Sequence, residues 1–76
     1  MKPSIPEILQ AFMSGDLSPK AANNALLGHF QAQSSEKRQA MTRQYIDEIM
    51  ADLEAGMVSI ELATDGLEDS VAASHA

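Results

Sequence analysis

The chain has 76 residues, enough for one domain only, and it has no cysteine, which excludes disulfides and thiolate metal sites. The formal charge is −6, and it is unevenly distributed: all five Lys and Arg residues lie in residues 1–43, whereas eight of the eleven acids lie in residues 44–76. This surplus opposes binding to nucleic-acid phosphates and favours a protein partner with a basic patch.

The first predicted helix begins near Ser4 and ends before Gly15. Ser4 and Glu7 have the spacing of a capping box, in which each side chain accepts a hydrogen bond from the other residue's backbone N–H. Pro6 could instead take the first helical position, which would leave Ile5 outside the helix. Glycine commonly ends helices because it adopts the left-handed conformation without strain.

The second predicted helix opens at Ser18, the expected N-cap, with Pro19 at the first helical position, where its missing N–H costs nothing. Apolar residues then recur at three- and four-residue spacing up to Phe30, so we expect the helix to run to about residue 30. His29 lies on this apolar face, and we expect it to be a half-buried packing residue.

A polar connection over residues 31–37 leads into the longest predicted helix, residues 35–55, with Ser34 or Ser35 as its N-cap. Its apolar residues cover about half of the helix circumference, which is wider than one neighbouring helix needs. These residues are Met41, Tyr45, Ile46, Ile49, Met50 and Leu53. We therefore expect this helix to contact neighbours on two sides and to form a homodimer interface through the same arc.

Gly56 ends the third helix, and Ser59 is expected to cap a fourth helix from Ile60 to about Ala72. We expect the last residues, 72–76, to be frayed. Strand-forming residues are sparse and no stretch alternates with a period of two, so the predicted fold class is all-α with four helices.

Two parts of the chain match without gaps when residues 5–30 are placed on residues 46–71, an offset of 41. Seven of the 26 positions are identical, whereas average residue usage gives about two. Each copy reads as a helix, a Gly-x-hydrophobe-Ser turn and a second helix. The sequence therefore predicts a single domain, 1–76, of two similar hairpins linked by residues 31–45 through the long third helix. The alternative is two unrelated hairpins that use the same favourable turn residues.

The hairpins resemble helix-turn-helix modules, so a DNA-binding transcriptional regulator that uses the basic half of the chain is the alternative function. The basic residues concerned are Lys20, Lys37, Arg38 and Arg43. The corresponding helix of the second copy carries acids that would face phosphates, and the net charge has the wrong sign.

No catalytic, cofactor or metal motif is recognisable, so we predict no enzymatic activity, no cofactor and no metal site. Glu48 and Asp52 have i,i+4 spacing, but a di-metal centre in a four-helix protein also needs Glu-x-x-His pairs, which the sequence lacks. No apolar stretch reaches the length of a membrane span, and we expect a cytoplasmic protein.

Apolar residues flank the second turn and lie close in sequence to several acids. An apolar patch with a charged rim is the usual anatomy of a protein-docking surface. The predicted partner-binding residues are Asp47, Asp52, Glu54, Met57, Ile60 and Glu61. The favoured function is a small acidic interaction module, a regulator, adaptor or inhibitor of another protein; a phage-type inhibitor of a host enzyme belongs to this class. Alternatively, the acidic surplus only serves solubility.

Overall fold

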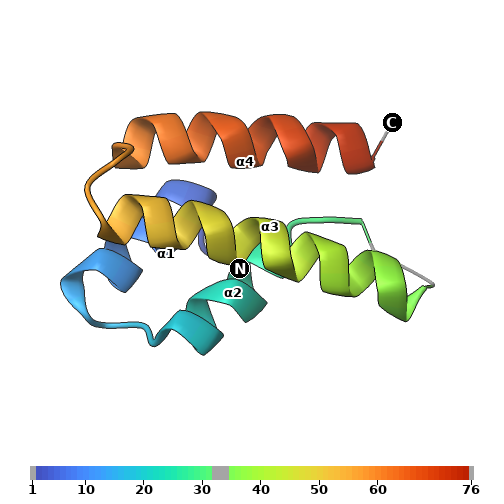
Figure 1. Ribbon diagram of the computed structural model, residues 1–76, viewed down its shortest axis with the longest axis horizontal. Coiled ribbons are helices and arrows are strands. Elements are labelled where there is room, and N and C mark those ends of the chain that lie inside the picture. Colours follow the sequence, from blue (N-terminus) through green and yellow to red (C-terminus); the bar gives the residue numbers. More distant parts are fainter. Residues whose placement is uncertain (1, 32–34, 76) are drawn as a thin grey trace.

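A computed structural model describes residues 2–31 and 35–75, which form four α-helices and no strand (Figure 1). The helices are α1 (Ile5–Ser14), α2 (Pro19–Leu27), α3 (Glu36–Glu54) and α4 (Ile60–Ser74). The predicted all-α class with four helices is confirmed. None of these helices combines the length and hydropathy that a bilayer crossing requires.

Each helix begins with a serine N-cap whose hydroxyl accepts a hydrogen bond from the backbone N–H three residues later. The caps are Ser4, Ser18, Ser35 and Ser59. Of the two candidates for the cap of α3, the structure uses Ser35, and Ser34 lies outside the described residues. Ile5 belongs to α1, because the helix starts directly after Ser4 and Pro6 occupies its second position.

Ser4 and Glu7 form the predicted capping box at the start of α1. The Ser4 backbone N–H and hydroxyl donate to Glu7 Oε1 at 3.0 and 2.8 Å, and the Glu7 N–H donates to Ser4 Oγ at 3.4 Å. The bond from the Ser4 backbone, followed by that from its hydroxyl, lowers the pKa of Glu7, because both bonds favour the charged carboxylate.

Glu7→Gln is expected to remove a pH-dependent stabilisation of α1. The pKa of Glu7 is lowered in the folded state, so its contribution is fully present above the ordinary pKa of a glutamate and is lost as the pH falls through the lowered value. The difference in free energy of unfolding between the native protein and the variant should therefore shrink in acid. Urea unfolding followed by circular dichroism at several pH values measures it, and a pH-independent difference would contradict the prediction.

The two hairpin turns share two backbone features. Gly15 and Gly56 have positive φ angles of 89° and 77°, the left-handed conformation that other residues adopt only with strain. In both turns the residue after the glycine donates its N–H to the carbonyl five residues earlier, at 2.8 and 2.9 Å. These matching features are 41 residues apart, the same offset as the sequence match.

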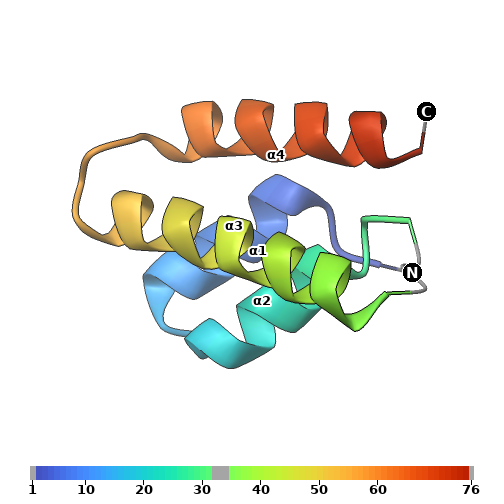
Figure 2. The ribbon, with the colours of Figure 1, turned by 45° about the vertical axis from the view of Figure 1, so that its right-hand side comes forward.

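The four helices pack in a cycle. α1 packs against α2 and α4, and α3 packs against the same two helices. Figure 2 shows both hairpin turns at one end of the molecule, and the segment before α1, the residues directly after α2 and the end of α4 at the other. If α1 is exchanged with α3 and α2 with α4, the same four packed pairs result. This is expected for two similar hairpins that bury the same faces.

The core lies inside this cycle of helices. Its buried apolar residues are Ile5, Ile8, Leu9, Phe12, Ala22, Leu26, Ile46, Met50, Leu53, Ala63 and Leu67. Seven residues of the first hairpin are buried, including one polar residue, Asn23. Their equivalents 41 residues later are also buried, apart from the half-buried Ile49.

α2 is shorter than predicted: it ends at Leu27 rather than near residue 30. The Gly28 carbonyl accepts a hydrogen bond from the Lys2 ammonium, and the His29 ring donates to the Pro3 carbonyl at 2.7 Å. Glycine has a low helix propensity, and the bond from Lys2 satisfies the Gly28 carbonyl, which a longer helix would have paired internally. His29 is half-buried, as predicted.

α4 is longer than predicted, because it continues to Ser74 where fraying was expected from residue 72. Ser74 Oγ accepts a hydrogen bond from the Gln31 N–H at 3.2 Å, and the His75 ring donates to the His29 carbonyl at 3.2 Å. Contacts with the α2–α3 connection thus hold the last turn of α4, and residue 76 lies outside the described residues.

α3 contacts neighbours on two sides, α2 and α4, as its wide apolar arc predicts. The three fully buried members of the arc, Ile46, Met50 and Leu53, pack within the chain itself, and Tyr45 and Ile49 are half-buried against the same core. The arc that the sequence assigns to a homodimer is therefore largely occupied by this chain. Met41 differs, since its side chain is 62% exposed. The homodimer itself stays a prediction.

Candidate protein-docking surface

The second hairpin turn presents large apolar side chains to solvent. Met57 is 74% exposed and Leu62 is 63% exposed, while Ile60 between them is half-buried against the core. The equivalent positions of the first turn hold Asp16 in place of Met57 and Ala21 in place of Leu62. The two turns therefore share backbone features but differ at these two positions, where only the second has large exposed apolar side chains. The first turn has one exposed apolar neighbour, Met13 at the end of α1, which is 45% exposed.

Local contacts hold this apolar patch on a fixed backbone. Gly56 ends α3 in the left-handed conformation, and the Ser59 hydroxyl accepts the Leu62 N–H at 3.1 Å, which fixes Leu62 in the first turn of α4. Val58 is half-buried against the core and anchors the turn. A partner would therefore contact Met57 and Leu62 without first having to order the backbone that carries them.

Three exposed carboxylates lie within five residues of Met57 in the sequence. Asp52 and Glu54 lie in the last turn of α3, and Glu61 lies in the first turn of α4. No Lys or Arg follows residue 43 in the sequence, so the second turn and α4 contribute no lysine or arginine to this surface. Five of the six predicted partner-binding residues thus lie on or beside the second turn.

The sixth, Asp47, lies elsewhere. Its carboxylate accepts a hydrogen bond at 2.7 Å from the side-chain amide of Asn23, which is only 5% exposed and also donates to the Arg43 carbonyl at 3.1 Å. The Arg43 guanidinium in turn donates to Asn23 Oδ1 at 3.0 Å and to Asn24 Oδ1 at 2.7 Å. Asp47 therefore belongs to a polar cross-link between α2 and α3, which closeness in sequence to the second turn does not reveal.

Leu62 is the surface residue that the sequence-based prediction missed. On the first copy it aligns with Ala21, and it directly precedes the buried Ala63 and Thr64. A large apolar residue where the other copy has alanine, at the edge of the buried face, is the signal that could have identified it.

The polar cross-link also bears on the DNA-binding alternative. Asparagine side chains can contact bases, but Asn23 of α2 is buried and its amide is occupied by α3. Lys20 and Asn24 remain exposed on α2, and Arg43 is held against both asparagines. α2 therefore offers fewer groups for base contacts than its sequence indicates.

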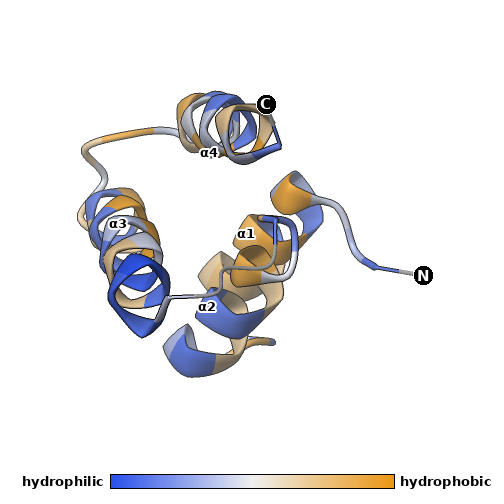
Figure 3. Cartoon of the chain, turned by 90° about the vertical axis from the view of Figure 1, so that its right-hand side faces the viewer, coloured by the Kyte–Doolittle hydropathy of each residue, from blue (hydrophilic) through white to orange (hydrophobic). Residues whose placement is uncertain are grey.

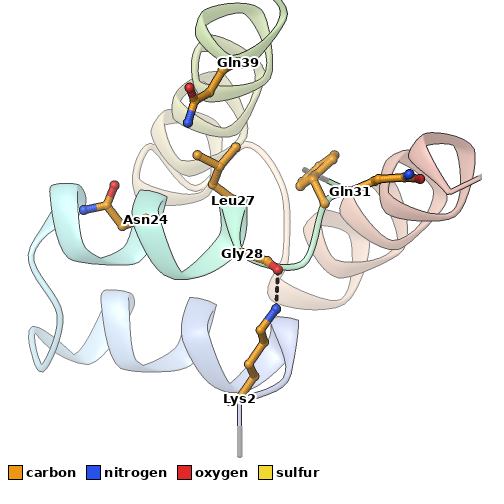
Figure 4. Close-up of a pocket in the computed structure, with 7 residues that line it drawn as sticks. Lys2, Asn24, Leu27, Gly28, Gln31 and Gln39 are labelled. Carbon is orange, nitrogen blue, oxygen red and sulfur yellow. Dashed lines mark hydrogen bonds between the residues drawn. The ribbon is translucent and has the colours of Figure 1, made fainter. Parts of the chain in front are cut away.

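A cavity of about 540 Å³ lies between α2, α3 and the segment before α1 (Figure 4). It is lined by Lys2, Asn24, Leu27, Gly28, Phe30, Gln31 and Gln39. Lys2 is the ionisable residue of this lining, and its ammonium donates to the Gly28 carbonyl, as the dashed line in Figure 4 shows. This lining does not contain the pair of titratable groups that general acid–base catalysis uses.

Among residues 2–31 and 35–75, no three His, Asp or Glu side chains are grouped closely enough to hold a metal ion. Comparisons with protein-family models, curated proteins and solved structures found no match to this chain.

Proposed function

We propose that the protein is a small interaction module that regulates, recruits or inhibits another protein through the second-turn surface. This surface consists of Asp52, Glu54, Met57, Ile60, Glu61 and Leu62. The complementary partner has an apolar depression with Lys or Arg residues around it. An enzyme with a basic groove for nucleic acid is one partner of this kind, and the protein would then act as its inhibitor.

The exposed apolar pair at the centre of the surface supports this proposal. Met57 and Leu62 are more exposed than any other large apolar residue among those described. Burial of a leucine or methionine side chain contributes about 1.5–3 kcal/mol, which is enough for such residues to dominate the affinity of a small interface. Methionine also adapts its shape to irregular partner surfaces.

The position of the acids is the observation on which the proposal chiefly rests. Asp52 and Glu54 lie in the last turn of α3, where the helix macrodipole is negative, and that turn contains no basic residue. Each acid at such a position costs about 0.3–1 kcal/mol of helix stability. A sequence that places two there opposes its own folding, and such local conflicts concentrate at functional sites.

The paired change Asp52→Asn and Glu54→Gln is expected to separate binding from folding. It should raise the free energy of unfolding by about 1 kcal/mol, because the unfavourable charges are removed from the helix end. It should also reduce the capture of partner proteins from an extract of the native cell at least tenfold. Urea unfolding and quantitative mass spectrometry measure the two effects, and weaker capture by a more stable variant cannot result from unfolding.

The apolar part of the surface requires a second variant and a control. Met57→Ser with Leu62→Ser should lose the same captured proteins, whereas Met13→Ser, a change at an exposed methionine of α1 outside the second-turn surface, should retain them. An unchanged set of captured proteins in both second-turn variants would contradict the proposed function.

A further inference from the structure

α3 has one side that no other helix of the chain covers. On one flank, Asn23 of α2 bonds to Arg43 and Asp47. On the opposite flank, the Tyr45 hydroxyl donates to the Gly66 carbonyl of α4 at 3.3 Å and accepts from the Ser70 hydroxyl at 3.0 Å. The side between these flanks points away from the molecule, at the left edge of Figure 3.

The residues on this side, the outer face of α3, are all exposed and follow one another at alternating spacings of four and three. They are Lys37, Met41, Gln44, Glu48 and Ala51. This alternation is the spacing of the seam between two paired helices in a coiled coil. Met41 is 62% exposed and is the one member of the predicted homodimer set that the core leaves largely uncovered.

The charges of α3 are ordered along its length. Its first eight residues contain three bases and one acid, whereas the residues from Asp47 to Glu54 contain four acids and no base. Of these charges, Lys37 and Glu48 belong to the outer face, while Arg43 faces α2. A second copy of the same helix in the opposite direction would place basic residues against acidic ones at both ends. The two helix dipoles would then also be antiparallel, which is favourable.

We propose that two copies of this chain pair through the outer faces of α3, antiparallel, about a two-fold axis between residues 42 and 43. Lys37 of each protomer then lies opposite Glu48 of the partner subunit. Met41 lies beside Gln44 of the partner subunit, and the two Met41 side chains meet near the axis, about 4.5 Å apart along the helices. Each contact occurs twice, as in any closed two-fold pair.

Other arrangements of the same face are less favourable. A parallel pair would place Lys37 against Lys37. An antiparallel pair shifted to bring Lys37 opposite Asp52 would place Met41 against Glu48 and desolvate a carboxylate against an apolar side chain. The proposed register is the one that places methionine at the centre and charge pairs outside it. The proposed dimer does not depend on the function proposed for the second turn.

Charge exchange tests the register. Sedimentation equilibrium over a range of concentrations should show the mass of the native protein rising from 8.1 kDa towards twice that value. Lys37→Glu and Glu48→Lys should each raise the dimer Kd roughly tenfold or more, because each places two pairs of like charges across the interface. The double variant should restore the Kd to within about threefold of the native value, since it reinstates both pairs in reverse.

Two further variants complete the test. Met41→Asp should abolish the dimer, while Lys20→Glu, which makes the same charge change as Lys37→Glu on an exposed residue of α2, should leave it unchanged. All variants alter exposed side chains, and circular dichroism should show native helicity. A mass of 8.1 kDa at every concentration would overturn the dimer. Rescue of Lys37→Glu by Asp52→Lys in place of Glu48→Lys would overturn the register.

Discussion

Replacement of Leu67 by alanine is expected to lower the free energy of unfolding by about 3 kcal/mol. Leu67 is fully buried in α4, and its loss removes apolar contacts and leaves a cavity that the surrounding helices only partly fill. At about 0.05–0.15 kcal/mol per residue, a chain of this length has a total stability of about 4–11 kcal/mol. A single such change therefore removes a large part of the stability.

The sequence match between the two hairpins supplies a matched comparison. Leu26 is the equivalent of Leu67 in the first hairpin and is also fully buried, so Leu26→Ala should cost the same within about 1 kcal/mol. Leu62→Ala, on the exposed second-turn surface, should cost well under 1 kcal/mol. Urea unfolding followed by circular dichroism gives all three values. A cost for Leu62→Ala as large as that for Leu67→Ala would contradict the burial pattern.

Asn23→Ala is expected to lower the free energy of unfolding by about 1–3 kcal/mol, because it removes a buried amide that bonds α2 to α3. Its loss leaves the Asp47 carboxylate and the Arg43 guanidinium without this partner. Asn24→Ala is the control: the residue is the exposed neighbour of Asn23, and it accepts one hydrogen bond from Arg43. If urea unfolding gave the same loss of free energy of unfolding for both variants, the buried amide of Asn23 would stabilise the protein no more than the exposed amide of Asn24.

The equivalent of Asn23 in the second hairpin is Thr64. There, the same reasoning predicts that removal of the buried polar group does not lower the free energy of unfolding. The Thr64 hydroxyl is buried, and no partner for it occurs in the part of the chain that the structure describes. Thr64→Val keeps the shape of the side chain and removes this desolvated group, so we expect the stability to stay equal or to rise by about 1 kcal/mol. A clear loss would mean that the hydroxyl is hydrogen-bonded in solution.

The two proposed surfaces are compatible with each other. The outer face of α3 and the second-turn surface share no residue. In an antiparallel pair about an axis between residues 42 and 43, the second turns of the two protomers would lie at opposite ends of the dimer. Such a dimer would present two separate docking surfaces, and a partner with two matching sites would bind it more tightly than one with a single site.

The amino-acid sequence by itself determined the helix starts, the turns and most of the buried positions. Ser4, Ser18 and Ser59 cap the helices as predicted, and Gly15 and Gly56 adopt the left-handed conformation that the turn pattern requires. These features depend on residues within one helical turn of each other, so local chemistry decides them. The apolar spacing likewise identified the side of each helix that is buried.

Only the tertiary structure decided where α2 and α4 end, which partner Asp47 bonds to and which apolar residues stay exposed. The end of α2 depends on Lys2 and Pro3, and the end of α4 on the α2–α3 connection. Each of these contacts joins residues more than twenty positions apart. Periodicity gives the face of a helix but not the helix that covers it, and for this reason the wide arc of α3 predicted a dimer interface where the chain packs against itself.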